Sequence, residues 1–500
     1  MSTGLTRVPM QPVHLGRPAL HRAGCAAPWY HVADSARDSG ILAVLGSLRE
    51  SRQTEHTVER SMGREMAGKR ALKVGLLGLG VVGSGVAEIL CRKADTLERE
   101  IGRRVEIARV LVRDPIKPRR LESLRPLLTT DPAAVLDDPE IDIVIELMGG
   151  EEPARSYICR AIKNRKHLVT ANKEVMAKHG LAVLQLAQEH GVDVYYEASV
   201  GGGIPLIGTF RQDLAANEVR EILAIINGTT NFILSKMAQE GWTFEDALHA
   251  AQQLGYAEAD PTNDIEGIDA AYKLAILASI AFRQQIRPEQ IYREGITRLH
   301  PSDFRYAHEL GYAIKLLAIA RASDGEVEVR VHPTLVPQHW LLAQVNGVFN
   351  AVQLDGDLVG KVLFYGQGAG AYPTASAVVA DVIDIVHNIN SGVANRVPFL
   401  VNGRRRLRPI GEVASRHYFR FWVADRPGVL AKIAHIFGEN NISIASVLQK
   451  ESDETAQFTE LVIMTHVSRE AWVQRALEQI RTLDVVREVA ACLRVEIGER

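Results

Sequence analysis

The stretch LKVGLLGLGVVGSGVAEILCRK, residues 72–93, constrains the fold more than any other part of the sequence. An apolar run from Leu72 to Leu77 leads into three glycines spaced as G-x-G-x-x-G, and an amphipathic helical pattern follows to about Lys93. In a dinucleotide-binding unit, these glycines allow a tight turn, close approach of the backbone to the pyrophosphate, and packing of helix on strand. We therefore expect cofactor contacts at Gly78, Gly80, Val81, Val82 and Gly83. The alternative is a glycine turn with only a structural role.

Four further strand-like segments, VEIARVLV, DIVIELMGG, HLVTANK and VDVYYEASVGGG, alternate with helical patterns up to residue 200. This alternation predicts an α/β fold with a Rossmann-type doubly wound parallel sheet. Ligands bind at the carboxyl ends of such strands, so Lys173 is expected to face the cofactor crevice. Arg113 follows the second strand, with Asp114 and Lys117 nearby. An acid there would bind a ribose hydroxyl, whereas Arg113 and Lys117 would bind a 2′-phosphate, which favours NADP over NAD unless both are ordinary surface charges.

The segment GYAEADPTNDIEGIDAAYK, residues 255–273, concentrates five carboxylates and ends on one lysine. The helical pattern IDAAYKLAILASIAF places Asp269 and Lys273 four residues apart on one helix face. Three interpretations follow, in order of preference. In the first, the loop residues Glu258, Asp260 and Asp264 are delivered to the start of this helix, where the carboxylate cluster grips a substrate ammonium group and holds Lys273 in a charge state suited to proton transfer. The charges otherwise form a plain salt-bridge network, or they bind a divalent metal.

The same segment resembles the signature of homoserine dehydrogenases. Four other motifs support the resemblance in family order, over about residues 72–400: TANKE at 170–174, EASVGGGIP at 197–205, INGTTNFIL at 226–234 and GQGAGAYPTASAVVAD at 366–381. The resemblance implies an NAD(P)-dependent oxidoreductase that interconverts L-aspartate 4-semialdehyde and L-homoserine, in threonine, methionine and isoleucine biosynthesis.

The family's functional residues fall on matching positions of this sequence. The resemblance implies that Lys273 donates a proton, that Asp269 and Glu258 bind the substrate, and that Lys173 lies between cofactor and substrate. Which lysine transfers the proton stays open at this point. It implies further cofactor contacts at Gly255, Gly368 and Gly370. It also implies a monovalent cation, sodium, bound by Glu197 and by the backbone carbonyls of Val200, Gly202 and Ile204, a donor set that suits a hard cation. The alternative there is a glycine turn that shapes the domain junction.

The last part of the chain has the order strand, helix, strand, strand, helix, strand in about 80 residues, which predicts a ferredoxin-like module. Its segment DRPGVLAKIAHIF resembles an ACT regulatory domain. The resemblance implies pairing into a homodimer or homotetramer and an amino-acid effector, for which we expect L-threonine, at Asp425, Gly428 and Asn441. The alternative is a module that only dimerises.

The expected domain organisation combines these parts. A disordered extension covers residues 1–70; the dinucleotide-binding domain covers 71–200 and 366–400; an α+β substrate and dimerisation domain covers 201–365; a solvated basic linker covers 401–415; and the ACT module covers 416–498. A transit peptide, or translation starting at Met62 or Met66, are alternatives for the extension. No aspartokinase-like segment precedes the nucleotide fold, so we expect a monofunctional enzyme.

The composition excludes several classes of function. The 58 basic and 60 acidic residues leave no positive excess for nucleic acid, and no apolar run approaches the ~18 residues that span a membrane. Four cysteines without C-x-x-C spacing favour a reducing cytoplasm. An aspartate-semialdehyde dehydrogenase would need a nucleophilic cysteine, but Cys91 and Cys159 fall in helical segments. A non-catalytic sensor is the second alternative, although it would not require both Lys173 and Lys273.

Overall fold

The computed structural model describes residues 70–117, 121–395, 401, 403–450 and 457–497. All of them belong to one compact unit, Lys69–Arg500. The predictions for residues 1–69, namely disorder, a transit peptide or a later start, lie outside the described residues. None of the helices in these ranges is long and apolar enough to cross a membrane.

The first domain is a parallel sheet of six strands in the order β3-β2-β1-β4-β5-β6, as a doubly wound nucleotide fold requires. The strands are β1 (Leu72–Leu77), β2 (Val105–Leu111), β3 (Leu128–Thr129), β4 (Ile143–Glu146), β5 (His167–Thr170) and β6 (Val194–Tyr195). The connecting helices are α2 (Val81–Arg92), α3 (Ala94–Ile101), η1 (Glu122–Leu127), α4 (Ala133–Leu136), α5 (Ala154–Lys163) and α6 (Lys173–His190). The predicted Rossmann-type sheet is confirmed, and only the two-residue β3 was not anticipated.

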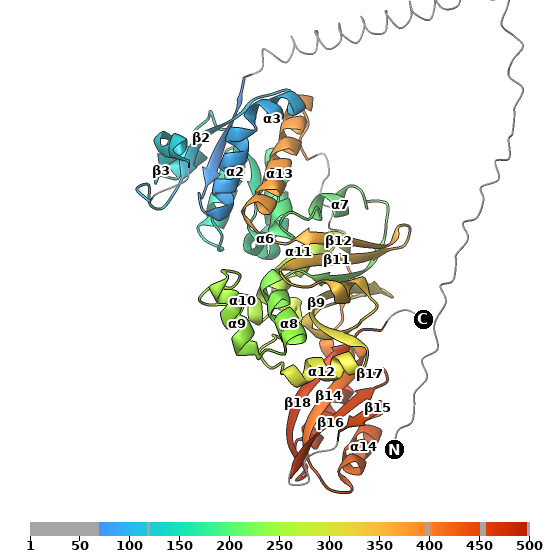
Figure 1. The fold of residues 1–500 in the computed structure, drawn as a ribbon. Coiled ribbons are helices and arrows are strands. Elements are labelled where there is room, and N and C mark those ends of the chain that lie inside the picture. The colour runs from blue at the N-terminus through green and yellow to red at the C-terminus, as the bar shows by residue number, and fades with distance from the viewer. Residues whose placement is uncertain (1–69, 118–120, 396–400, 402, 451–456, 498–500) are drawn as a thin grey trace, which may run out of the picture. The chain divides into compact units, whose positions relative to one another are not determined.

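A helix from much later in the sequence completes this domain. The helix α13 (Ala371–Ser391) packs beside α2 (Figure 1). A Cβ atom on Gly85 of α2 would lie 2.9 Å from the carbonyl oxygen of Ala371, so the two helices pack at a distance that only glycine permits. The nucleotide-binding domain is therefore built from two separate parts of the chain.

The second sheet contains twelve strands, and its main path runs β12-β11-β7-β9-β10-β18-β14-β16-β15. Its strands are β7 (Val219–Ile225), β8 (Tyr292–Arg293), β9 (Tyr312–Ser323), β10 (Glu326–Pro337), β11 (Phe349–Gly356), β12 (Gly360–Gln367), β13 (Arg406–Leu407), β14 (Ala414–Ala424), β15 (Ile444–Gln449), β16 (Phe458–Thr465), β17 (Ser468–Arg469) and β18 (Val486–Val495). β18 pairs with β10, so one sheet runs through the substrate domain and the C-terminal module. The sequence suggested two separate modules.

The remaining helices are η2 (Glu197–Ser199), α7 (Ile207–Arg211), α8 (Gly228–Glu240), α9 (Phe244–Gln253), α10 (Thr262–Ile265), α11 (Ile268–Ala281), η3 (Pro288–Gln290), α12 (Pro301–Glu309), η4 (Leu341–Gln344), η5 (Ile410–Glu412), α14 (Val429–Glu439) and α15 (Glu470–Ile480). Most of them lie beside this sheet, with α8, α9 and α10 next to β9 and α14 in the C-terminal module (Figure 1). The order β14, α14, β15, β16, α15, β18, with the sheet order β18-β14-β16-β15, is the predicted ferredoxin-like plan.

The basic segment before this module is not a solvated connector, and that prediction is wrong. Its strand β13 pairs with β10. Arg406 binds Glu326 and Glu412, with nitrogen–oxygen distances of 2.5 and 2.6 Å. Arg408 binds Glu326 at 2.9 Å. The arginines have specific carboxylate partners, and their positive charge is balanced by acids from β10 and η5.

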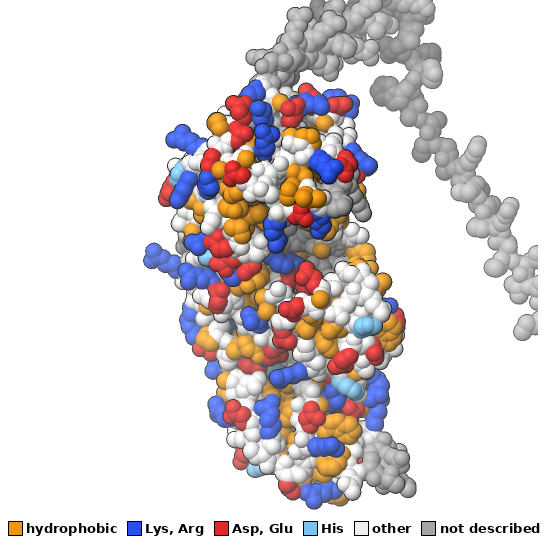
Figure 2. Space-filling view, turned by 90° about the vertical axis from the view of Figure 1, so that its left-hand side faces the viewer, with side chains coloured by type: hydrophobic (Ala, Val, Ile, Leu, Met, Phe, Trp, Pro, Cys, Tyr) orange, Lys and Arg blue, Asp and Glu red, His pale blue; other side chains and the backbone are white. Residues whose placement is uncertain are grey.

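The surface agrees with the balanced composition. On the face drawn in Figure 2, Lys and Arg side chains are interspersed with Asp and Glu side chains. This face offers no continuous positive field for a nucleic-acid backbone.

Candidate functional site

Five polar side chains meet where the nucleotide domain contacts the substrate domain, and we call them the lysine–aspartate cluster. They are Lys173, Asn227, Asp264, Asp269 and Lys273. Lys173 begins α6 directly after β5, and Asn227 caps α8 directly after β7. Asp264 lies in the single turn α10, and α11 carries the other two, four residues apart on one face.

Asp269 is the centre of the cluster. Its side chain is only 3% exposed. Its Oδ2 accepts hydrogen bonds from Lys273 Nζ at 2.7 Å and from Asn227 Nδ2 at 2.9 Å. Its Oδ1 accepts a hydrogen bond from Lys173 Nζ. Asn227 Nδ2 also donates to Asp264 Oδ1 at 2.7 Å. One buried carboxylate therefore holds two lysines from different domains.

The two lysines differ in how readily they lose a proton. Burial lowers the pKa of Lys273, and this effect outweighs the attraction of Asp269. Burial also opposes the charge on Lys173, but there the attraction of Asp269 prevails and the pKa is raised. For Asp269, the two lysines outweigh the effect of burial and hold the pKa well below its usual range. Asp269 thus remains a carboxylate, Lys173 remains a cation, and Lys273 is the proton-exchanging candidate.

Asn227 is the cluster residue that the sequence analysis did not select. Its side-chain oxygen accepts a hydrogen bond from the backbone N–H of Thr230 at 2.8 Å, as an N-cap does. The cap fixes the amide so that its nitrogen faces both aspartates. The signal was available, because Asn227 follows an apolar strand just as Lys173 does.

The nucleotide side of the site has the geometry that its glycine spacing predicted. A Cβ on Gly83 would lie 2.3 Å from the carbonyl oxygen of Gly78, so helix and strand approach more closely than any side chain allows. Gly80 caps α2 and has open space where its Cβ would be, and Val81 beside it is 72% exposed. Val82 is half-buried. The N-terminus of α2 is therefore accessible to a phosphate group.

Comparisons with known proteins agree with this geometry. The family model "Homoserine dehydrogenase, NAD binding domain" matches residues 78–197, "Homoserine dehydrogenase" matches 205–383 and "ACT domain" matches 417–485. A homoserine dehydrogenase of Pseudomonas aeruginosa is 46% identical over 432 residues, which cover 85% of this chain and 99% of that protein. The chain belongs to the homoserine dehydrogenase family. It is accordingly an NAD(P)-dependent oxidoreductase with the activity of a homoserine dehydrogenase.

Solved structures of homoserine dehydrogenases share the fold. The crystal structure of the enzyme from Thiobacillus denitrificans is 46% identical, with a TM-score of 0.80, and covers 85% of this chain and 98% of that one. A mutant of a hyperthermophilic archaeal homoserine dehydrogenase, solved in complex with NADPH, is 27% identical with a TM-score of 0.55. The similarity covers 63% of this chain and 98% of the archaeal chain.

The predicted substrate carboxylates separate into two groups. Asp264 belongs to the cluster, and burial raises its pKa. Glu258 lies at the surface, where its backbone carbonyl accepts a hydrogen bond from Gln252 Nε2 at 3.2 Å. None of the described contacts of the cluster involves the Glu258 carboxylate. The prediction that Glu258 binds the substrate of this homoserine dehydrogenase is therefore not supported by a contact here.

The remaining cofactor candidates lie either on exposed turns or where two segments of backbone pack closely together. Arg113 is exposed at the end of β2, and Asp114 Oδ1 accepts hydrogen bonds from the backbone N–H groups of Ile116 and Lys117, at 2.8 and 3.2 Å. Gly370 caps α13 with a φ of 123°, and Gly255 follows α9 with a φ of 74°. A Cβ on Gly368 would lie 1.9 Å from Asn350 Nδ2, so this junction excludes a side chain.

The glycine segment predicted to hold a cation surrounds Glu197. Its carboxylate accepts hydrogen bonds from the backbone N–H groups of Leu206, Ile207 and Gly208 at 2.5, 2.9 and 2.6 Å. The Asp381 carboxylate accepts one from the Glu197 N–H at 2.9 Å. Burial raises the pKa of both acids. Nowhere in the described ranges do three or more His, Cys, Asp or Glu residues form a metal cluster. Main-chain oxygens at Val200, Gly202 and Ile204 would have to complete the site.

The predicted effector residues lie at both ends of α14. Asp425 and Gly428 are exposed in the turn before the helix, and Asn441 is exposed after it. An 11-residue helix is about 16 Å long, so one small ligand cannot contact both ends within one chain. If the three residues share a ligand, two copies of the chain must contribute them.

The three cysteines in the described ranges, Cys91, Cys159 and Cys492, do not form a second catalytic site. Cys91 and Cys159 lie in α2 and α5, as expected, and burial raises the pKa of Cys91. Cys492 lies in β18, and burial raises its pKa to about 12. A thiol with a raised pKa is a poor nucleophile, which argues against the aspartate-semialdehyde dehydrogenase alternative.

Proposed function

We propose that Lys273 exchanges the proton with the substrate oxygen while homoserine and aspartate 4-semialdehyde interconvert. The observation that carries this proposal is the single carboxylate of Asp269, which holds both lysines, and of these two only Lys273 has a lowered pKa. A bound nicotinamide supplies or accepts the hydride at C4. In reduction the Lys273 ammonium donates a proton to the C4 oxygen, and in oxidation the neutral amine accepts it. Lys173 stays charged and stabilises the developing alkoxide.

Asp264 is our candidate for the ammonium group of the substrate. Asp269 already accepts hydrogen bonds from three donors, so we assign it the task of positioning the lysines. Asp264 accepts one hydrogen bond from Asn227, and burial disfavours its negative charge. A substrate ammonium group beside Asp264 would stabilise its negative charge. The role of Glu258 stays a prediction, which requires this exposed residue to move toward the substrate.

The lowered pKa of Lys273 predicts a pH dependence with opposite signs in the two directions. For homoserine oxidation Lys273 must be neutral, so kcat should rise with pH and level off below the ordinary lysine pKa of about 10.4. For the reduction it must be protonated, so kcat should fall through the same pH range. Initial rates in both directions, with buffers of matched ionic strength, check this. Identical slopes in both directions would contradict the assignment.

The choice of cofactor is proposed to depend on Arg113 and Lys117, which lie beyond β2 where a 2′-phosphate would bind. The archaeal homoserine dehydrogenase solved with NADPH supports NADP. We expect Arg113→Ala to raise the KM for NADP roughly tenfold, about the value of one charge-assisted contact, and to leave the KM for NAD unchanged. Arg109→Ala is the matched control, because Arg109 is an exposed arginine within β2 itself. Equal losses for both cofactors would contradict the assignment.

We propose that the monovalent cation binds beside Glu197. One carboxylate with three main-chain carbonyls is a hard-oxygen donor set. Burial opposes the negative charge on Glu197 and Asp381 and raises their pKa values, and a sodium ion beside them would offset that penalty. The ion would hold the glycine segment 200–204 in place. The three cysteines that the structure describes are free, which is in keeping with a reducing cytoplasm.

L-Threonine is the proposed effector of the ACT module, in a homodimer or homotetramer. The ACT match and the exposed turns at the ends of α14 support it. The test of the whole proposal is the initial rate of L-homoserine oxidation, followed as reduced cofactor, with NADP or NAD and with or without L-threonine. We expect faster turnover with NADP and inhibition by threonine. Folded protein that binds NADP without turnover would instead support the sensor alternative.

A further inference from the structure

The edge of β10 that lies opposite β9 is filled by three short segments from different parts of the chain. β13 pairs with the start of β10, and β8 pairs with its middle, where Val331 is opposite Arg293. β18 pairs with its end, where Thr334 is opposite Arg494. β8 belongs to the substrate domain, whereas β18 is the last strand of the ACT module. The two parts therefore meet on a single strand.

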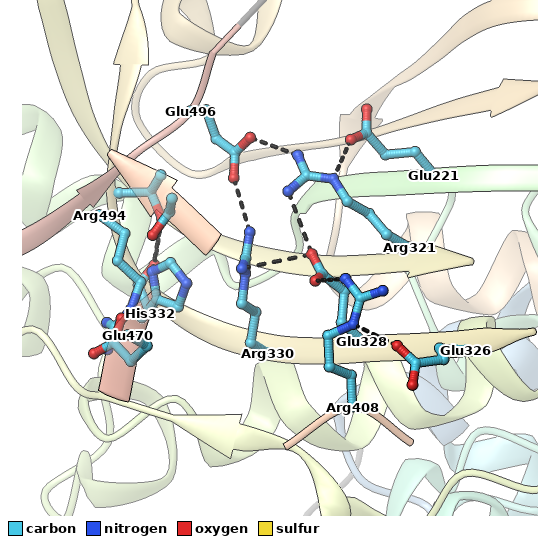
Figure 3. Close-up of polar contacts among 12 residues, drawn as sticks. Glu221, Arg321, Glu326, Glu328, Arg330, His332, Arg408, Glu470, Arg494 and Glu496 are labelled. Carbon is cyan, nitrogen blue, oxygen red and sulfur yellow. Dashed lines mark hydrogen bonds and ion pairs between the residues drawn. The ribbon is translucent and has the colours of Figure 1, made fainter. Parts of the chain in front are cut away.

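Arg494 joins them with side-chain contacts. It is 2% exposed, and its guanidinium donates two hydrogen bonds to Glu470 of α15, at 2.7 and 2.9 Å. The same guanidinium donates to Glu294 at 3.0 Å and to the Tyr292 hydroxyl at 3.2 Å. Figure 3 shows Arg494 and Glu470 at one side of the ionic network where β18 meets β10. A buried guanidinium bound on both sides has little freedom to move.

The residues after β8 connect Arg494 to the turn before α11, the helix that holds Asp269 and Lys273. The Glu294 N–H donates to the Val331 carbonyl at 2.8 Å, and the Ile296 N–H donates to the Ile265 carbonyl at 2.9 Å. A Cβ on Gly295 would lie 2.5 Å from that Ile265 oxygen. A Cβ on Gly267, the cap of α11, would lie 3.2 Å from Val331 Cγ1. With no free space between them, a shift of the segment 294–296 must move the turn 265–267.

We propose that the contact between Arg494 and Glu294 positions the turn 265–267, and that through this turn the ACT module sets the geometry of Asp269 and Lys273. The second half rests on the proposed threonine regulation. Asp269 is two residues beyond Gly267, at the start of α11, and Asp264 is in the turn before it. Glu294 is a positioning residue, because it acts through the backbone of its own segment and through α11.

Another ion pair between the two parts supplies a matched control. Lys450, the residue after β15, binds Glu309 of α12 at 2.5 Å. The side chains of Glu294 and Glu309 are 34% and 37% exposed, but their partners differ, since Arg494 is 2% exposed and Lys450 is 46% exposed. The free energy of unfolding of both variants is therefore measured alongside the exchange. Only Glu294 lies in the segment that is hydrogen-bonded to Ile265. A general weakening of the contact between the parts would speed exchange at residues 262–273 in both variants, in proportion to the stability that each loses.

The test compares Glu294→Gln with Glu309→Gln in the full-length protein. We expect the amide hydrogens of residues 262–273 to exchange roughly tenfold faster in Glu294→Gln, the effect of one charge-assisted hydrogen bond, and to be unchanged in Glu309→Gln. Threonine should still bind Glu294→Gln in calorimetry but inhibit it less. Because coupling is reciprocal, homoserine should also shift its threonine affinity less than in the wild type.

Each outcome decides one half of the proposal. Unchanged exchange at 262–273 in Glu294→Gln overturns the positioning role. Faster exchange with undiminished threonine inhibition overturns the transmission from the ACT module. A wild-type protein that does not respond to threonine overturns the proposed regulation, and the exchange result then decides the positioning role alone.

Discussion

Replacing Lys273 with methionine is expected to lower kcat for homoserine oxidation by about three orders of magnitude, the usual effect of losing a general acid–base group. Methionine keeps the length and apolar part of the side chain but cannot exchange a proton. It also removes the hydrogen bonds to Asp269 and to the Ile226 carbonyl, at 2.7 and 2.8 Å. The KM for NADP should change little, because Lys273 does not lie beside the glycine turn. Steady-state kinetics with both substrates measure the two effects.

Lys315→Met is the matched control for this variant. Lys315 is also buried, in β9, where burial lowers its pKa to about 8. It donates to the Val345 carbonyl and to Asn346, and it is not part of the lysine–aspartate cluster. Its loss should destabilise the fold but leave kcat per folded molecule nearly unchanged. Similar losses of kcat in both variants would mean that the loss in Lys273→Met reflects a perturbed fold and not the loss of a proton-exchanging group.

Replacing Glu470 with glutamine is expected to destabilise the ACT module by about 3 kcal/mol, since it removes one partner of a buried ion pair. Glu470 accepts two hydrogen bonds from Arg494 and one from His417, and it is 2% exposed. Burial opposes its charge, but these partners prevail and lower its pKa. The stabilisation is therefore present above the ordinary glutamate pKa of about 4.3 and is lost as the pH falls below it.

Hydrogen exchange of α15 and β18 measures this effect locally. A loss of about 3 kcal/mol corresponds to exchange faster by roughly two orders of magnitude. Glu412→Gln is the control, because Glu412 pairs with Arg406 at the surface, where both side chains are about half exposed. Such a pair contributes about 0.5 kcal/mol or less. Equal effects of the two substitutions would contradict the view that burial makes the Glu470 pair important.

Local patterns in the sequence predicted the elements of the fold that depend on near neighbours. The apolar run before Gly78 predicted β1, and the helical pattern after Gly267 predicted α11 with Asp269 and Lys273 on one face. The strand β3 was missed because two residues carry no periodicity. The pairing of β18 with β10 could not be predicted, since register between distant strands leaves no local signal.

Local patterns also predicted part of the candidate site. Lys173, Asp264, Asp269 and Lys273 came from local motifs, and the structure brings them together. The sequence gives no measure of burial, so it could not separate the exposed Glu258 from the buried Asp269 or assign different pKa directions to the two lysines. Arg494 was overlooked because a charged residue near the end of a strand is usually solvated, whereas this one is 2% exposed.

The most direct test of the central claim is a crystal structure of the ternary complex with NADP and L-homoserine. We predict that the C4 oxygen of homoserine lies within hydrogen-bond distance of Lys273 Nζ, about 3 Å. We also predict that the α-ammonium group lies against Asp264 and that Asp269 still holds both lysines. A C4 oxygen bound to Lys173 or to water, with Lys273 turned away from the substrate, would contradict the account.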